Sequence, residues 1–402
     1  MNNLDHPTTS DQRIELLDAL RGLALFGVLI VNLRYFSLFE LLTNEARAAL
    51  TTARWDEVIG AVLAALVDTK AITVFSILFG VSFMMQAQRS AARGEGMGRF
   101  VRRMLVLLGI ALVHTYVFWW GDILRYYALM GLVLVLVVNW SARRLAWLGV
   151  VIVLLPSVFL RPVMPYLLPH VSSAPQASAA ALAAFTGPHI VRMWRANLAY
   201  DLWTLVSSWS LWFFVLGRLL LGAALGRGGF LQNATGHVRF WIRLLIATLP
   251  SGLVLTTFVL LREHHWMGLG GAWWTTEPGR MVNRLVRNVA SLSLGMAYIA
   301  AFVLLFLRAG WRSWLRLLCP PGRMALTNYL LQTVLAVPLF YGVGFGIGPR
   351  FGLPGIIVVG IVLFSGQIFF SHWWLGKFRF GPLEWVWRCL TYGRWLPLKA
   401  TA

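Results

Sequence analysis

Long apolar segments separated by short polar ones recur along the whole chain. Most are about twenty residues long, the length that an α-helix needs to cross the hydrocarbon core of a bilayer. A transmembrane β-barrel would instead show short segments in which apolar and polar residues alternate. The chain is therefore predicted to be an all-α, polytopic membrane protein. The hydropathy pattern predicts ten spans, over residues 16–37, 70–88, 101–120, 122–139, 144–161, 202–225, 241–261, 286–308, 324–344 and 353–375.

Two further segments are expected at the membrane surface. Residues 55–67 have the pattern of an amphipathic helix that precedes the second span. The segment 376–396 mixes Trp, Phe and Arg, which are side chains that anchor well at the membrane interface. We expect a single transmembrane domain over 1–402, with an amino-terminal five-span half (1–161) and a carboxy-terminal half (202–396) that ends in an interfacial tail helix.

The basic residues are concentrated in loops that a ten-span arrangement places on one side of the membrane. These loops cover residues 88–103, 139–144, 226–243 and 307–316. Because loops rich in Lys and Arg stay in the cytoplasm, this side is predicted to be cytoplasmic and both termini with it. The longer loops 162–201 and 262–285 would face outward, and residues 171–185 of the first are expected to be partly helical.

Composition supports the membrane class and removes one alternative. The 402 residues are 58% hydrophobic and only 12% charged, whereas soluble domains are about one quarter charged. The formal net charge of +20 would suit a nucleic-acid-binding protein. However, the positive-inside rule already accounts for the basic loops, so no nucleic-acid partner is predicted.

The first predicted span carries charged and amide side chains at membrane depth. Asp18 and Arg21 are three residues apart, so they are neighbours on one helix face and can form an ion pair. Asn32 follows Arg21 by close to three helical turns, about 16 Å along the axis, and lies on the same face. This polar face can line a cavity. Alternatively its role is structural: Asp18 and Arg21 form a salt bridge at the membrane interface, and Asn32 is hydrogen-bonded to a neighbouring helix.

A second polar group is predicted at the tight turn between the third and fourth spans. His114 lies toward the outer part of the third span, Asp122 lies in the turn, and Arg125 opens the fourth span. A histidine can take a proton from a hydroxyl or an amine near neutral pH, and a carboxylate can orient it. The alternative is a structural histidine whose ring nitrogens are hydrogen-bonded within the protein.

Two more polar pairs have helical spacing. Asn328 and Gln332 are four residues apart in the ninth span, so they share one face. Interhelical hydrogen bonding is the ordinary role of such amides, and lining a cavity is the alternative. Glu384 and Arg388 are also four apart, in the tail helix, where this spacing typically gives modest helix support.

Several catalytic patterns are absent from the sequence. There is no glycine-rich phosphate loop of the ATPase type, no nucleophile elbow, and no Cys or His cluster with the spacing of a metal site. His264 and His265 are adjacent in a loop and lack the i,i+4 spacing of helical zinc ligands. ATP hydrolysis and zinc catalysis are therefore disfavoured, and no metal site is predicted.

Five segments in the same order resemble the successive signatures of one protein family. They are LLDALRGLALFGVLIVN, DTKAITVFSILFGVSF, HTYVFWWGDILRYYALMG, GRMALTNYLLQ and GPLEWVWR. Together they resemble the bacterial YeiB family, whose carboxy-terminal half is a named domain of unknown function (domain-of-unknown-function family 418). The resemblance runs over nearly the whole chain and implies a multi-pass protein of the bacterial cytoplasmic (inner) membrane.

The YeiB family is distantly similar to transmembrane acyltransferases, such as heparan-α-glucosaminide acetyltransferase and the acyltransferase-3 enzymes. This kinship implies acyl transfer from cytoplasmic acyl-CoA to a sugar or small-molecule acceptor at or beyond the outer face. Acyl-CoA would be a substrate, and no permanently bound cofactor is implied. The acyltransferase-3 signature is an Arg followed, after ten residues, by a His. Here Arg21 is followed by GLALFGVLIV and then by Asn32, whose amide cannot act as a base.

The leading hypothesis is therefore an O- or N-acyltransferase in which His114 is the general base and Asp122 orients it. The residues expected to bind substrate or line its cavity are Asp18, Arg21, Asn32, Arg125, Asn328 and Gln332. The main alternative is a transporter or channel for a small solute or lipid that uses the same polar faces. A third hypothesis is a non-catalytic membrane partner or sensor. Membrane lipid is an expected partner in each case, and a homodimer is left open.

Overall fold

The computed structural model describes residues 15–168, 171–263 and 271–399. Regular structure over these residues is helical, apart from an isolated backbone bridge between Phe378 and Lys399. The predicted all-α class is therefore confirmed.

Within the described residues, eight helices or helical stretches are long and apolar enough to cross a membrane. They are α1 (Glu15–Phe36), α3 with α4 (Ala53–Ala92), α5 with the π-helical turn η4 (Gly98–Phe118), α7 with α8 (Ala142–Phe159), α12 (Ser210–Arg227), α13 (Val238–Glu263), α14 (Glu277–Phe306) and α18 (Leu353–Lys377). Two shorter apolar helices are α6 (Leu124–Leu136) and α17 (Ala325–Phe340). Each of the ten predicted spans falls on one of these segments, and the chain is a polytopic membrane protein.

The boundary predicted at residue 202 is wrong. Residues 202–207 end α11 (Ile190–Ser207), and α12 begins only at Ser210. The apolar run continues across the break between the two helices, so hydropathy alone joined them. The rest of the predicted outer loop contains α9 (Met164–Leu167) and α10 (Ala174–Phe185), and α10 confirms the expected helical portion.

Residues 55–67 form the helix that the sequence predicts, here α3 (Ala53–Leu66). A short turn joins α3 to α4 (Lys70–Ala92), where Thr69 has a φ of 64°, in the left-handed region. One face of α3 exposes large apolar side chains at helical spacing, which suits contact with lipid. These side chains are Trp55, Val58, Val62 and Leu66.

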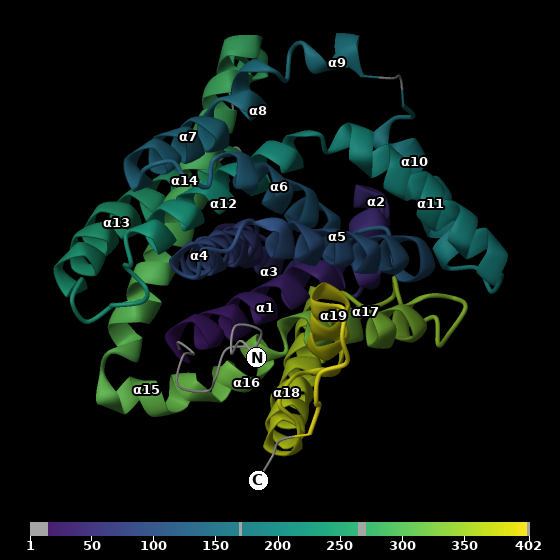
Figure 1. The fold of residues 1–402 in the computed structure, drawn as a ribbon. Helices are drawn as coiled ribbons and strands as arrows, with labels where there is room; N and C mark the ends of the chain where they lie inside the picture. Colours follow the sequence, from purple (N-terminus) through teal and green to yellow (C-terminus); the bar gives the residue numbers. More distant parts are fainter. Residues whose placement is uncertain (1–14, 169–170, 264–270, 400–402) are drawn as a thin grey trace.

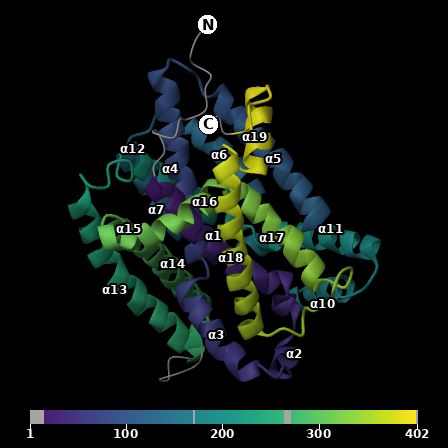
Figure 2. The same ribbon diagram turned by 90° about the horizontal axis from the view of Figure 1, so that it is seen from below.

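The central helices pack closely because small residues lie where they meet. α1 lies between α4, α17 and α18 (Figures 1 and 2), and α4 packs along α12. A Cβ at Gly80 would lie 2.0 Å from the Leu219 carbonyl oxygen, and one at Gly222 would lie 2.0 Å from that of Ile77. The backbones of α4 and α12 are therefore in direct contact, as in other membrane helix pairs with small residues at the interface.

Outer elements surround this centre on different sides. α13 packs on α14 at one side of the bundle, while α10 and α11 lie at the opposite side (Figure 1). The turned view in Figure 2 places α19 at one end of the bundle and α2 at the other. The remaining short elements are η3 (Phe39–Leu41), α2 (Asn44–Ala48), η6 (Ala272–Thr275), α15 (Ala309–Leu315), η7 (Arg316–Leu318), α16 (Cys319–Arg323) and the tail helix α19 (Pro382–Tyr392).

Candidate functional site

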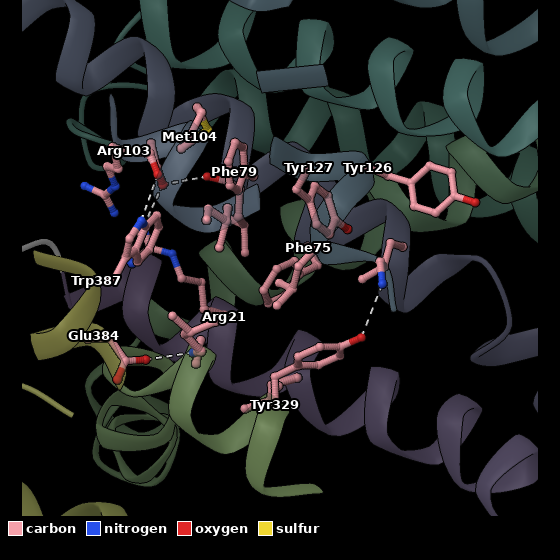
Figure 3. Close-up of a pocket in the computed structure, with 18 of the residues that line it drawn as sticks. Arg21, Phe75, Phe79, Arg103, Met104, Tyr126, Tyr127, Tyr329, Glu384 and Trp387 are labelled. Carbon is pink, nitrogen blue, oxygen red and sulfur yellow. Dashed lines mark hydrogen bonds between the residues drawn. The ribbon is translucent and has the colours of Figure 1, made fainter. Parts of the chain in front are cut away.

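A cavity of about 740 Å³ runs through the bundle between α1, α4, α5 and α6. Its wall changes character along its length, from charged to apolar to polar. Figure 3 shows this progression, from Arg103 and Trp387 past Phe75 and Phe79 to Tyr329. We call its first part the basic mouth and its last part, around Asp122, the polar end.

The basic mouth is rich in arginine. Among the described lining residues, eight arginines face three carboxylates here, which leaves an excess of positive charge. The arginines are Arg21, Arg89, Arg93, Arg99, Arg103, Arg323, Arg379 and Arg388, and the carboxylates are Asp18, Glu95 and Glu384. Most of these residues come from segments that the sequence places on the cytoplasmic side. The mouth can therefore attract an anionic group by charge alone.

Aromatic side chains order part of the mouth. The Arg103 guanidinium lies 4.1 Å from the centroid of the Trp387 ring and also donates to Gln86 Oε1 at 3.3 Å. The Trp387 indole N–H donates to the Arg103 carbonyl oxygen at 2.9 Å, which ties α19 to α5. Figure 3 shows Arg103 and Trp387 close together at one side of the group of lining residues.

The middle of the cavity is apolar. Its wall contains side chains from α1, α4 and α5, namely Leu25, Val28, Phe75, Phe79, Met104 and Leu107. The Tyr127 ring stacks on Phe79 with centroids 5.4 Å apart, and its hydroxyl is bonded to Ser76 at 2.9 Å. This section suits a flexible chain without charge.

The polar end is built on an irregular turn. After α5 (Gly98–Val113), the π-helical turn η4 (His114–Phe118) begins at His114, and the Trp119 N–H bonds back to the His114 carbonyl at 3.0 Å. Such π-turns are frequent at functional sites. A Cβ at Gly121 would lie 2.4 Å from the Trp119 ring, so only glycine fits this tight turn. The turn brings His114 and Asp122 together, as the sequence predicts.

Asp122 is held by three groups. His114 Nδ1 lies 3.0 Å from Asp122 Oδ1, the Tyr329 hydroxyl donates to the same oxygen at 3.2 Å, and the Arg125 N–H donates to Oδ2 at 3.2 Å. The last bond caps the first turn of α6. His114 Nε2 lies 2.9 Å from Thr333 Oγ1, so both ring nitrogens have partners.

Asp122 and Tyr329 line the cavity, whereas His114 does not. The His114 side chain is fully buried behind Asp122. The structure therefore brings together the two residues expected to form the catalytic pair. However, it places Asp122, and not the expected base His114, next to the cavity. A substrate in this cavity would meet Asp122 and Tyr329 before His114.

Arg125 forms a buried ion pair that the sequence did not indicate. Its guanidinium lies 2.6 Å from Asp201 Oδ1 and donates to Oδ2 at 2.8 Å. Asn197 of the same helix, α11, accepts from the Trp120 N–H and donates to the Thr115 carbonyl, both at 2.7 Å. α11 thus closes the polar end through polar contacts. Arg125 lines the cavity, but Asp201 balances its charge.

Asp18, Arg21 and Asn32 all line the cavity, on one face of α1. The predicted ion pair is present, with Arg21 Nη1 2.7 Å from Asp18 Oδ1. Arg21 also donates to Ser82 Oγ at 2.6 Å, which joins α1 to α4. Of the two interpretations of this polar face, the structure supports the lined cavity. The part these residues play in binding a substrate stays a prediction.

Asn328 and Gln332 do not line this cavity, which corrects the expectation that they do. Asn328 donates to Ser371 Oγ at 2.9 Å, and Gln332 donates to Gln367 Oε1 at 3.0 Å. Gln367 donates in turn to the Asn328 carbonyl at 2.8 Å. Both amides therefore join α17 to α18, because a buried amide on a helix face turned toward another helix finds its partners there.

Glu384 reaches another helix instead of only supporting its own. Its Oε1 accepts the N–H groups of Leu326 at 2.7 Å and Thr327 at 3.0 Å, and its Oε2 accepts the Thr327 hydroxyl at 2.5 Å. Burial raises the pKa of the Glu384 carboxyl, and these hydrogen bonds act in the opposite direction. The carboxylate thus caps the first turn of α17.

Sequence reasoning missed Tyr329, Thr333 and Asp201. Tyr329 and Thr333 are four residues apart, so a search of α17 for polar residues on one helix face could have found the pair. Asp201 gave no comparable signal, because its partner lies 76 residues away. No group of three or more His, Cys, Asp and Glu side chains arranged for a metal ion occurs in the described part of the chain. His264 and His265 lie outside it.

Comparison with known proteins gives relatives over nearly the whole length. The chain is 29% identical over 417 residues to the uncharacterized protein YxaH of Bacillus subtilis (strain 168), covering 98% of this chain and 97% of that protein. It is 29% identical over 391 residues to the uncharacterized protein YeiB of Escherichia coli (strain K12), covering 94% and 96%. Residues 225–394 match the family model described as "Protein of unknown function (DUF418)". The resemblance to the YeiB-like family is confirmed.

The DUF418 match covers only one part of the candidate site. The DUF418 region contains Tyr329, Thr333 and Glu384, whereas His114 and Asp122 precede it. The cavity therefore lies between the DUF418 region and the amino-terminal part of the chain. No solved structure gives a significant match.

Proposed function

We propose that this protein is an integral membrane acyltransferase. It would take an acyl group from acyl-CoA bound at the basic mouth and transfer it to a hydroxyl or amine at the polar end. The observation that carries this proposal is one cavity that joins an excess of arginines to Asp122 through an apolar section. Its volume of about 740 Å³ is within the range of small-molecule sites.

The chemistry of coenzyme A suits the order of the wall. Its phosphates are anionic, and arginine guanidinium groups bind phosphate through charge-assisted, often bidentate hydrogen bonds. Its pantetheine arm is long and uncharged, which suits the section lined by Phe75, Phe79 and Met104. The thioester at the end of that arm would then lie near Asp122. The positive-inside rule would place the basic mouth at the cytoplasmic face of the inner membrane, where acyl-CoA is found.

The transfer step assigns each residue a role. The acceptor oxygen or nitrogen forms a bond to the acyl carbon, and the carbon–sulfur bond of the thioester breaks. The acceptor proton passes to the carboxylate of Asp122 and then to the departing CoA thiolate, so the protein ends unchanged. Tyr329 and His114 hold Asp122 in place through the hydrogen bonds to Oδ1. General base catalysis of this kind contributes about 10²- to 10⁴-fold to a rate.

This assignment moves the proton-accepting role from His114 to Asp122. His114 is buried and bonded at both ring nitrogens, so it acts as a positioning residue behind the carboxylate. Arg21 and Asp18 stand at the mouth, where Arg21 would contact the phosphates. Asn32 lines the cavity farther along α1 and would contact the arm or the acyl group.

Binding of CoA to the purified protein in nanodiscs tests the proposal, with acetyl-CoA hydrolysis as the measure of turnover. Arg103 and Arg102 are a matched pair, because they are neighbours on α5 and only Arg103 is among the described lining residues. Arg103→Ala is expected to weaken CoA binding about tenfold, since hydrogen bonds to charged groups contribute about 1.5–3 kcal/mol. Arg102→Ala is expected to bind CoA as the wild type does.

A wild-type protein that binds neither CoA nor acetyl-CoA would overturn the proposal. Solute flux into liposomes without an acyl donor would favour a transporter.

A further inference from the structure

The first five residues of α17 touch both ends of the candidate site. At its start, the N–H groups of Leu326 and Thr327 are bound by Glu384, which lines the basic mouth. Only two residues later, Tyr329 extends its hydroxyl to Asp122 Oδ1 at 3.2 Å. Figure 3 shows Glu384 and Tyr329 on either side of this short stretch of helix. Movement of the first turn would therefore move the Tyr329 hydroxyl.

The cap on α17 comes entirely from the tail helix. Met324, at the N-cap position of α17, provides no side-chain cap. The N–H groups at the start of a helix lack partners within the helix and stabilise a nearby anion. Glu384 supplies that anion, and Leu383 N–H donates to Thr327 Oγ1 at 3.1 Å as a second link between α19 and α17.

The same tail helix contributes to the wall of the basic mouth. Trp387 and Arg388 follow Glu384 by one turn, and both line the cavity. The Trp387 indole N–H donates to the Arg103 carbonyl oxygen, so α19 is attached to α5. Through Glu384 and Leu383, α19 is also attached to α17. A ligand at the mouth would contact the helix that caps α17.

We infer that Glu384 is a positioning residue that holds the Tyr329 hydroxyl against Asp122 and links this contact to occupancy of the basic mouth. The inference deepens the proposed acyl transfer and rests on it. When donor phosphates bind beside Trp387 and Arg388, α19 is fixed, and Glu384 then fixes the first turn of α17. Turnover would thus be efficient only when the donor is in place.

Thr327 offers a matched pair of variants for the test. Thr327→Val keeps the shape of the side chain but removes the hydroxyl that bonds Glu384 Oε2 and the Leu383 N–H. Thr327→Ser restores this hydroxyl. We expect Thr327→Val to lower kcat by up to about tenfold, the effect expected from losing the Tyr329 hydroxyl itself. KM and CoA affinity should change less than about twofold. Thr327→Ser is expected to restore kcat to near the wild-type value, and Glu384→Gln is expected to follow Thr327→Val.

Amide hydrogen exchange provides a readout that needs no substrate. Amides at the start of α17 are expected to exchange at least tenfold faster in Glu384→Gln than in the wild type, and CoA is expected to slow their exchange in the wild type only. Unchanged exchange and kcat in both Glu384→Gln and Thr327→Val would overturn the inference. Equal losses of CoA affinity and kcat in these variants would also overturn it, since they would indicate that the substitutions disrupt donor binding at the basic mouth. A wild-type protein that binds no CoA would overturn the proposed function and the link between α17 and occupancy of the basic mouth. Amide exchange measured without CoA would still decide whether Glu384 holds the start of α17.

Discussion

The two ends of the cavity carry charge in different ways. At the basic mouth, eight of the described lining residues are arginines and three are carboxylates, so positive charge remains available to a ligand. At the polar end, Arg125 is paired with Asp201, and Asp122 accepts from three donors on neighbouring groups. An excess of positive charge is suited to binding an anionic ligand. Charges that are paired within the protein are suited to holding groups in a fixed geometry.

This difference separates the expected effects of mutation. Changes at the polar end should alter turnover and leave donor affinity intact. Changes to the arginines of the basic mouth should alter donor affinity and leave turnover at saturation intact, whereas Glu384, which caps α17, should act on turnover.

The largest effect is expected for Asp122→Asn. The amide keeps the shape of the side chain but cannot accept the proton from the acceptor, so kcat for acetyl-CoA should fall about a thousandfold. CoA affinity should remain within about twofold of the wild type, because Asp122 lies away from the basic mouth. Single-turnover kinetics and equilibrium CoA binding measure the two quantities. Equal activity of Asp122→Asn and the wild type would remove Asp122 from the mechanism.

A large loss of stability is expected when the buried ion pair of the polar end is broken. Asp201→Leu leaves the Arg125 charge unpaired, which should lower the free energy of unfolding by about 3–5 kcal/mol. The double variant Arg125→Met/Asp201→Leu removes both charges and should recover most of that loss. Chemical denaturation in detergent micelles measures the cycle. Additive losses in the double variant would show that the pair does not act as a unit.

A moderate effect is expected for Tyr329→Phe. The ring is retained, but Asp122 loses the hydroxyl donor to Oδ1. One lost hydrogen bond to a charged group corresponds to about a tenfold change in rate. Single-turnover kinetics measures the effect. A variant with the wild-type rate would show that Tyr329 contributes only to packing.

The smallest effect is expected from salt. Raising the ionic strength from about 0.1 to 1 M shortens the Debye length from about 10 to 3 Å. CoA affinity should therefore fall by about threefold to tenfold, while kcat at saturating donor should stay constant. Titration of CoA at several salt concentrations provides the measurement. A salt-independent affinity would show that the surplus arginines do not contribute to donor binding.

The fold could be predicted closely from the sequence because hydropathy is a local property. Each predicted span corresponds to an apolar helix, and α3 and α10 appear where amphipathic or alanine-rich segments indicate them. The error at α11 has the same origin. Residues 202–207 are apolar enough to extend the following span, and nothing in the hydropathy pattern marks the break before Ser210.

The candidate site was predictable only where its partners are close in sequence. Asp18 and Arg21 are one helical turn apart, and His114 and Asp122 are joined by one tight turn. Tyr329 lies 207 residues from Asp122, and Thr333 lies 219 residues from His114. Glu384 shows the same limit, since its spacing to Arg388 indicated a local pair while its hydrogen bonds lead to α17.

The most direct test is a structure of the wild-type protein in nanodiscs with CoA bound, determined by electron cryomicroscopy. We predict phosphate density among Arg21, Arg103 and Arg388, an arm that passes Phe75 and Phe79, and a thiol that lies nearer to Asp122 than to the arginines. A cavity without CoA at saturating concentration, or CoA bound with its arm outside this cavity, would contradict the proposed acyl transfer.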